Sequence, residues 1–102
     1  MTDSEFLLEV KRHIHEIDPQ AQVWLFGSRA RGDARDDSDW DFLVLTDKPV
    51  DWTFKRRLRD HLFQLGLDSE RTIGTVIQNR NVWEDLKVTD LYQNVQEDGI
   101  AV

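Results

Sequence analysis

The residues with the clearest chemical potential are a glycine-serine turn and a pair of aspartates that follows it. The turn reads Gly27-Ser28-Arg29-Ala30-Arg31-Gly32, and Asp39-Trp40-Asp41 begins seven residues later. A turn of this kind can hold phosphate on its main-chain N–H groups. Two aspartates at positions i and i+2 of a strand share one face, with Cα atoms about 6.6 Å apart. Both carboxylates can then reach one divalent cation, so the two segments together predict a metal–triphosphate site.

The acidic residues around the turn indicate which cation such a site would hold. Five aspartates fall within nine residues: Asp33, Asp36, Asp37, Asp39 and Asp41. Two carboxylates about 4 Å apart repel each other by roughly 4 kcal/mol at an effective dielectric of 20. Because Asp39 and Asp41 begin a strand that must be partly buried, solvent screens this repulsion incompletely. Hard oxygen ligands without a nearby histidine or cysteine favour Mg²⁺ or Mn²⁺.

Two familiar binding loops do not fit this segment. The spacing Gly27-x4-Gly32 matches the opening of a P-loop, but Asp33-Ala34 stands where that motif requires Lys-Ser/Thr. The first three ligand positions of an EF-hand are matched by Asp37, Asp39 and Asp41. In that loop, however, Phe42 would occupy the obligatory glycine position and Lys48 the position of the final glutamate. Both interpretations are rejected.

The surrounding sequence predicts alternating helices and strands. Apolar residues recur at helical spacing before Asp18-Pro19 and again between Asp51 and Gly66, where the glycine is expected to end the helix. Three apolar or β-rich runs predict strands: Val23–Phe26, Trp40–Thr46 and Thr72–Gln78. A last helix is expected near Asp90–Asp98. The order α-β-α-β-α-β-α predicts an α/β (α+β) domain with helices packed on a sheet of three or more strands.

Several single residues carry more local predictions. Thr2 and Glu5 resemble a capping box for the first helix. Ser28 is expected to cap the N-terminus of a short helix that runs through Arg31. The tryptophans are expected to lie in the core: Trp24, Trp40, Trp52 and Trp83.

His13 and His15 lie two positions apart on a helix and do not share a face, so they form no metal pair. His61 is expected at the surface or its boundary.

Size and charge restrict the classes of function. The 102 residues suit one domain, residues 1–102, without room for a second substrate-binding domain. The net charge of −7 disfavours general nucleic-acid binding, which usually depends on Lys and Arg that neutralise phosphates. It suits a partner with a basic face or a site for divalent cations. No apolar run is near 18 residues and the N-terminus lacks a signal-peptide pattern, so no membrane association and a cytoplasmic location are expected.

The combined motif resembles the nucleotidyltransferase superfamily that includes DNA polymerase β. Gly27-Ser28 and Arg31-Gly32 match its turn, and Ser38-Asp39-Trp40-Asp41 matches its Asp-x-Asp segment. The expected apolar strands Val23–Phe26 and Phe42–Leu45 flank these residues. The whole chain is similar to the minimal nucleotidyltransferase branch, whose members are commonly antitoxins paired with a small helical HEPN ribonuclease. The resemblance implies the nucleotidyltransferase fold, with a small mixed sheet.

The resemblance also implies roles for individual residues. The Gly27-Ser28 turn would hold the β- and γ-phosphates of ATP, and Arg29 or Arg31 would add a charged phosphate contact. Asp39 and Asp41 would be the catalytic residues and would bind Mg²⁺ or Mn²⁺. The implied activity is transfer of AMP from ATP to a hydroxyl group on a partner protein, a HEPN-like toxin. From the residues alone, the two arginines fit equally well as partners of the acidic loop.

One position departs from the family pattern. The family has a third carboxylate on the strand after the second long helix, which helps to bind the metal that activates the acceptor. Gly74 stands at that position, and no acidic residue occurs from Arg71 through Val82. Glu70 lies just before the strand and would be a poor substitute. Nucleotide binding is expected to survive this departure, whereas transfer would be slow or absent.

Two alternatives to AMP transfer onto a partner protein are also considered, and Gly74 favours the first of them. The first is a non-catalytic module that binds nucleotide and neutralises its partner by steric cover. The second is an antibiotic-modifying transferase, which would require a dimer to build a drug pocket between subunits. The sequence leaves the nucleobase, the acceptor and the oligomeric state open, a homo-oligomer included.

Overall fold

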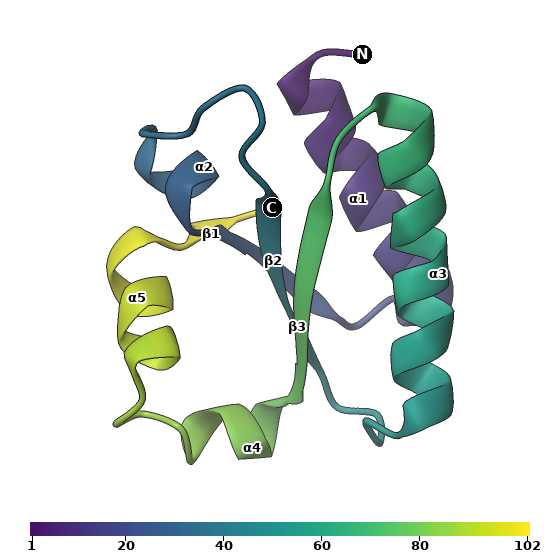
Figure 1. Cartoon of the computed structure of the whole chain (residues 1–102). Helices are drawn as coiled ribbons and strands as arrows, with labels where there is room; N and C mark the ends of the chain where they lie inside the picture. Colours follow the sequence, from purple (N-terminus) through teal and green to yellow (C-terminus); the bar gives the residue numbers. More distant parts are fainter.

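The continuous apolar runs form the central strands of a mixed four-stranded sheet. In a computed structural model that describes residues 1–102, β1 (Gln22–Phe26) and β2 (Trp40–Thr46) pair antiparallel. Parallel to β2 lies the edge strand β3 (Ile73–Asn79), and the short β4 (Ile100–Ala101) pairs antiparallel with β1 at the other edge. The strand order is therefore β3-β2-β1-β4, which confirms the predicted mixed sheet (Figure 1).

Five helices complete the fold. The two long ones, α1 (Asp3–Ile17) and α3 (Trp52–Ser69), cover one face of the sheet, whereas α4 (Arg80–Glu84) and α5 (Asp90–Asp98) lie on the other (Figure 1). The single-turn helix α2 (Ser28–Arg31) follows β1 directly. None of these helices combines the length and the apolar character that crossing a membrane requires.

Strand β2 separates two cores, because successive side chains of a strand point to opposite faces. Alternate residues of β2 join the larger core with α1 and α3: Trp40, Phe42 and Val44. The residues between them join the smaller core with α4 and α5: Leu43 and Leu45. By the same alternation, Asp41 lies on the face that carries α4 and α5, at the end where β2 begins.

The predicted boundaries of the long helices hold at three of four ends. The capping box of Thr2 and Glu5 is present, and α1 ends at Ile17, just before Asp18-Pro19. Asp51 caps α3 by accepting a hydrogen bond from the Phe54 N–H. The predicted stop at Gly66 is wrong, because α3 continues to Ser69. A Cβ atom at Gly66 would lie 2.7 Å from the carbonyl oxygen of Arg71, so this glycine admits the returning chain rather than ending the helix.

Three other expectations need correction. Gly27, not Ser28, occupies the N-cap position of α2, and Ser28 is its first helical residue. Trp52 is 70% exposed and lies beneath the Arg56 guanidinium instead of entering the core, because it begins α3 on the side turned away from the sheet. Helix α4 and strand β4 were not predicted. They have five and two residues, too few to show a hydrophobic period.

Candidate functional site

The turn after β1 has a backbone conformation that requires glycine. Gly27 has φ +77° and ψ −159°, a region that residues with a Cβ atom rarely adopt. Its carbonyl oxygen accepts hydrogen bonds from the N–H groups of Ala30 and Arg31, so the backbone itself caps α2. The N–H groups of Ser28 and Arg29 begin the helix and have no intrahelical acceptor. They form a short row of donors directly after the strand.

Asp41 lies between two glycines that come from neighbouring strands. The antiparallel pairing places it opposite Phe26, next to Gly27, and the parallel pairing places it opposite Gly74. A Cβ atom at Gly27 would lie 2.6 Å from Asp41 Oδ2, and one at Gly74 would lie 2.8 Å from Asp41 Oδ1. A side chain at Gly27 would displace Asp41 Oδ2, and a side chain at Gly74 would displace Asp41 Oδ1. The carboxylate position therefore depends on the absence of a side chain on both sides.

Asp39 and Asp41 influence each other electrostatically. Asp39 is exposed just before β2, whereas Asp41 is half-buried at its start. Burial raises the pKa of Asp41, the nearby charge of Asp39 raises it further, and the Arg31 charge partly offsets both effects. A raised pKa means that the ionised form of Asp41 is disfavoured without a cation. Two neighbouring carboxylates, one exposed and one half-buried, form a hard oxygen donor set that fits Mg²⁺.

The two arginines of the turn have different positions. The Arg29 guanidinium donates hydrogen bonds to the carbonyl oxygens of Asp36 and Ser38, each at 3.1 Å, and lies 4.7 Å from the ring centre of Trp40. It therefore supports the loop before β2 through backbone contacts, and a phosphate contact from Arg29 would require these bonds to be exchanged. This arrangement favours a structural role for Arg29.

Arg31 is the arginine of the turn whose charge acts on Asp41. Its Nε atom is 3.2 Å from Asp33 Oδ2, and its Nη1 atom is 3.7 Å from Asp98 Oδ2 at the end of α5. Its charge also lowers the pKa of Asp41. Asp98 is a neighbour of Arg31 that lies outside the sequence motif, so the motif did not identify it. Its approach to Arg31 depends on how α5 packs beside β1, and no local signal in the sequence reports that packing.

Gly74, which stands where the family pattern has a third carboxylate, lies on β3. Gly74 is directly opposite Asp41, and β3 contains no acidic residue from Ile73 through Asn79. Glu70 does not compensate, because it caps the C-terminus of α3 and lines a hollow between that helix and β3. At this end of the sheet, β2 therefore supplies Asp41 and the loop before it supplies Asp39, whereas β3 supplies no acidic residue.

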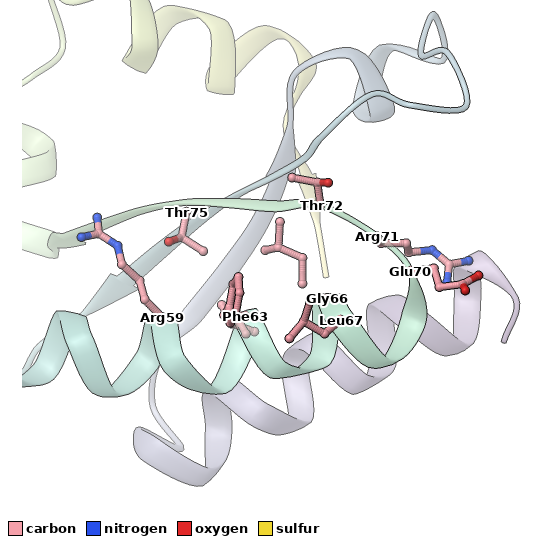
Figure 2. Close-up of a pocket in the computed structure, with 10 residues that line it drawn as sticks. Arg59, Phe63, Gly66, Leu67, Glu70, Arg71, Thr72 and Thr75 are labelled. Atoms are coloured by element: carbon pink, nitrogen blue, oxygen red, sulfur yellow. The ribbon is translucent and has the colours of Figure 1, made fainter.

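The hollow between α3 and β3 is separate from the aspartate pair. It has a volume of about 670 Å³, and its walls include Phe63, Leu67 and Thr75 (Figure 2). Thr75 follows Gly74 along β3, so its side chain lies on the opposite face of the sheet from Asp41. Neither the turn nor the aspartates contribute to its lining. The hollow is therefore no part of the candidate metal–triphosphate site.

Comparison with known proteins gives a family match over nearly the whole chain. The profile of the nucleotidyltransferase domain family matches residues 7–102. A Haemophilus influenzae protein named probable protein adenylyltransferase MntA is 37% identical over 57 residues. That alignment covers 56% of this chain and 50% of the relative, so the chain spans about half the length of that curated protein.

Two solved structures share the fold. A crystal structure of a toxin–antitoxin with AMP-PNP contains a chain that matches with a TM-score of 0.65 at 20% identity, over 98% of this chain and 72% of that one. A structure of the tri-AMPylated Shewanella oneidensis HEPN toxin in complex with MNT antitoxin gives a TM-score of 0.55 at 20% identity, over 94% of this chain and 70% of the other. At these identities the likeness shows the fold alone.

Proposed function

Because the chain belongs to the nucleotidyltransferase domain family, we propose that it binds ATP with Mg²⁺ and transfers AMP to a hydroxyl group on a partner protein. The observation that carries this proposal is the place of Asp41, held between Gly27 and Gly74 and next to Asp39. This arrangement puts paired carboxylates beside a turn with free N–H donors. The relative named as an adenylyltransferase supports AMP as the transferred group.

Each residue of the site has a proposed part in binding the donor nucleotide. The N–H groups and hydroxyl of the Gly27-Ser28 turn would donate hydrogen bonds to the β- and γ-phosphates, and Arg31 would add positive charge at their edge. Asp39 and Asp41 would hold Mg²⁺, which when bound neutralises charge on the phosphate oxygens. Arg29 would keep the loop in place, so that Asp39 stays near Asp41.

The proposed transfer is a displacement at the α-phosphorus of ATP. The acceptor oxygen forms a P–O bond to that phosphorus, the bond to the bridging oxygen breaks, and pyrophosphate leaves. The acceptor hydroxyl loses its proton in the same step. Strand β3 has no carboxylate that would help to hold a metal beside the acceptor and so favour loss of this proton, because Gly74 stands at that position. We therefore expect slow transfer, with the acceptor's own surroundings helping to remove the proton.

The proposed partner is a HEPN-like toxin, and the chain would act as its antitoxin. Two structures that share the fold, a toxin–antitoxin with AMP-PNP and a tri-AMPylated HEPN toxin with MNT antitoxin, support this choice. The net charge of −7 also suits a partner with a basic surface. A second candidate function, neutralisation by steric cover without transfer, is favoured by the single observation that Gly74 faces Asp41.

A labelling experiment separates these two functions. The chain is incubated with α-phosphate-labelled ATP, Mg²⁺ and the protein encoded next to it, and the label on that protein is counted. Transfer predicts labelled partner with the wild type and none with Asp39→Ala/Asp41→Ala. If the wild type forms a stable complex with its partner but leaves it unlabelled, the transfer proposal is wrong and steric cover takes its place.

A further inference from the structure

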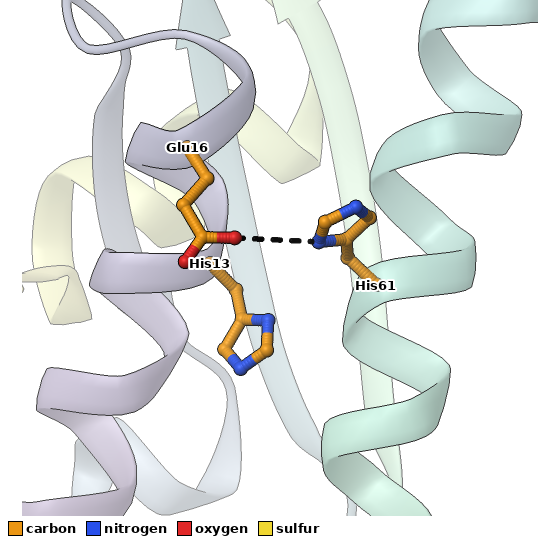
Figure 3. A group of neighbouring side chains, drawn as sticks. All are labelled: His13, Glu16 and His61. Atoms are coloured by element: carbon orange, nitrogen blue, oxygen red, sulfur yellow. Dashed lines mark ion pairs between the residues drawn. The ribbon is translucent and has the colours of Figure 1, made fainter.

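A second group of possible metal ligands lies between α1 and α3, on the face of the sheet opposite Asp41. His13 and Glu16 come from α1 and His61 from α3, and the three side chains meet between the helices (Figure 3). Each offers one ligand atom, and these atoms all lie within 4.8 Å of one another. His61 Nδ1 is 4.0 Å from Glu16 Oε2, and the two imidazole rings are 5.9 Å apart between centres.

His13 presents a nitrogen that nothing in the protein satisfies. Its Nδ1 atom is buried and has no hydrogen-bond partner, although buried polar atoms normally have one. Its other nitrogen, Nε2, lies 3.4 Å from Arg12 Nη2 and 3.8 Å from a carboxylate oxygen of Glu9. Histidines that bind metal through one nitrogen typically turn the other toward a carboxylate, which fixes the ring. Glu9 is a carboxylate of this kind near Nε2, which Arg12 also approaches, and the buried Nδ1 is the ring nitrogen left for a ligand.

Glu16 is also positioned by a neighbour without losing its capacity to bind. Arg12 Nη1 lies 2.7 Å from Glu16 Oε1, whereas Oε2 is the oxygen that faces His61. The arginine therefore occupies one oxygen and leaves the other toward the histidines. Because His13 and Glu16 are three residues apart on one helix, they share the face that α3 covers.

We propose that His13, Glu16 and His61 bind a divalent transition-metal ion of the Zn²⁺ class. Two imidazole nitrogens and one carboxylate suit Zn²⁺, whereas Mg²⁺ and Ca²⁺ prefer oxygen ligands alone. Bonds of about 2.0–2.2 Å would bring the ligand atoms to roughly 3.4 Å from one another, so each side chain must move by about 1 Å. Glu16 and His61 are 48% and 37% exposed and are free to make this adjustment. Three protein ligands leave a fourth position for water.

Metal binding at this place would link α1 to α3. An ion that binds the folded chain and not the unfolded chain stabilises the fold by mass action. The site shares no residue with the turn or with the Asp39–Asp41 pair. Its presence is therefore independent of the proposed nucleotide chemistry, and each can be tested without the other.

Calorimetric titration of the chain without a purification tag, using ZnCl₂ as the probe, tests the proposal. We expect one Zn²⁺ per chain in the wild type and an affinity at least ~10-fold lower in His61→Ala. His15→Ala is the matched control, because it removes a histidine of the same helix outside the cluster. Asp39→Ala/Asp41→Ala should keep the Zn²⁺ affinity of the wild type.

Thermal unfolding gives a second readout that does not depend on heats of binding. Saturating Zn²⁺ should raise the Tm of the wild type and of His15→Ala but not that of His61→Ala, whereas excess Mg²⁺ should not reproduce the shift. The proposal is overturned if the wild type binds no Zn²⁺ or if His61→Ala binds it as tightly as the wild type. It is equally overturned if Zn²⁺ binding disappears in Asp39→Ala/Asp41→Ala, because the ion would then occupy the aspartate pair.

Discussion

Asp41 shows how a residue of the proposed binding site can weaken the fold that carries it. Its pKa is raised, first by burial and then by the charge of Asp39. The folded chain thus holds this proton more tightly than the unfolded chain does. The resulting stability is fully present below the pKa of Asp41 in the unfolded chain and is lost as the pH rises through the higher pKa of the folded chain. At neutral pH without metal, the ionised carboxylate therefore destabilises the fold.

We expect Asp41→Asn to stabilise the metal-free chain at neutral pH. The gain should be less than about 1 kcal/mol, because solvent screens a half-buried group. Urea unfolding without divalent ions measures it, and the gain should shrink as the pH falls through the pKa of Asp41. Asp37→Asn is the control, since it removes the same charge from an exposed loop. A loss of stability in Asp41→Asn at neutral pH would contradict the electrostatic account.

At the scale of elements, the short helix α2 lies between two glycines with different surroundings, Gly27 at its N-cap and Gly32 at its C-cap. Gly27 and Gly32 both have positive φ, at 77° and 80°. A Cβ atom at Gly27 would press on Asp41 Oδ2, whereas one at Gly32 would meet no atom within 4 Å. Substituting each glycine in turn therefore distinguishes the effect of backbone strain from the effect of displacing the Asp41 carboxylate.

Gly27→Ala should weaken ATP binding, whereas Gly32→Ala should keep it. Both substitutions force a residue with a Cβ atom into a strained backbone region, at about 1–3 kcal/mol each. Urea unfolding should detect both losses, and calorimetry with ATP and Mg²⁺ should show at least a ~10-fold weaker affinity in Gly27→Ala alone. Equal losses of affinity in the two variants would mean that the turn acts only through its general stability.

The parallel pairing of β2 and β3 permits a direct test of the missing carboxylate. Gly74→Asp would place an acid opposite Asp41, but its Cβ atom would also approach Asp41 Oδ1. Gly74→Ala has the same approach without the charge and is the matched control. If the natural chain lacks a competent acceptor-side metal site, labelling of the partner should be faster with Gly74→Asp than with Gly74→Ala. Equal rates would assign the slow step to something other than the third carboxylate.

At the scale of the whole molecule, a buried polar contact joins the end of α1 to the end of β2. Asp18 is 1% exposed, and its carboxylate accepts hydrogen bonds from the Thr46 hydroxyl and the Gln20 N–H. Thr46→Val should lower the free energy of unfolding by about 1–3 kcal/mol, because a buried carboxylate loses a donor. Thr72→Val, at an exposed position, should change it by less than about 0.5 kcal/mol. Similar small effects in both variants would show that this contact does not support the fold.

The whole fold also shows which features the sequence could predict. The turn, the aspartate pair and Gly74 lie on or directly beside three strands that local apolar patterns predicted, and the family resemblance singled out Gly74 among the residues of the third. The encounter of His13 with His61 was not predictable, because it depends on how two helices dock on the sheet. The contact of Arg31 with Asp98 likewise depends on the packing of α5. Exposure of Trp52 was missed because residue type alone does not show which side of a helix start a side chain occupies.

The most direct test of the central claim is calorimetric titration of ATP into the chain with and without Mg²⁺. If Asp39 and Asp41 hold the ion that lets the Gly27-Ser28 turn bind the triphosphate, the wild type will bind ATP tightly only with Mg²⁺. The variant Asp39→Ala/Asp41→Ala will then show no benefit from Mg²⁺. ATP binding that is equally tight in wild type and variant, or independent of Mg²⁺ in the wild type, would contradict this account of the site.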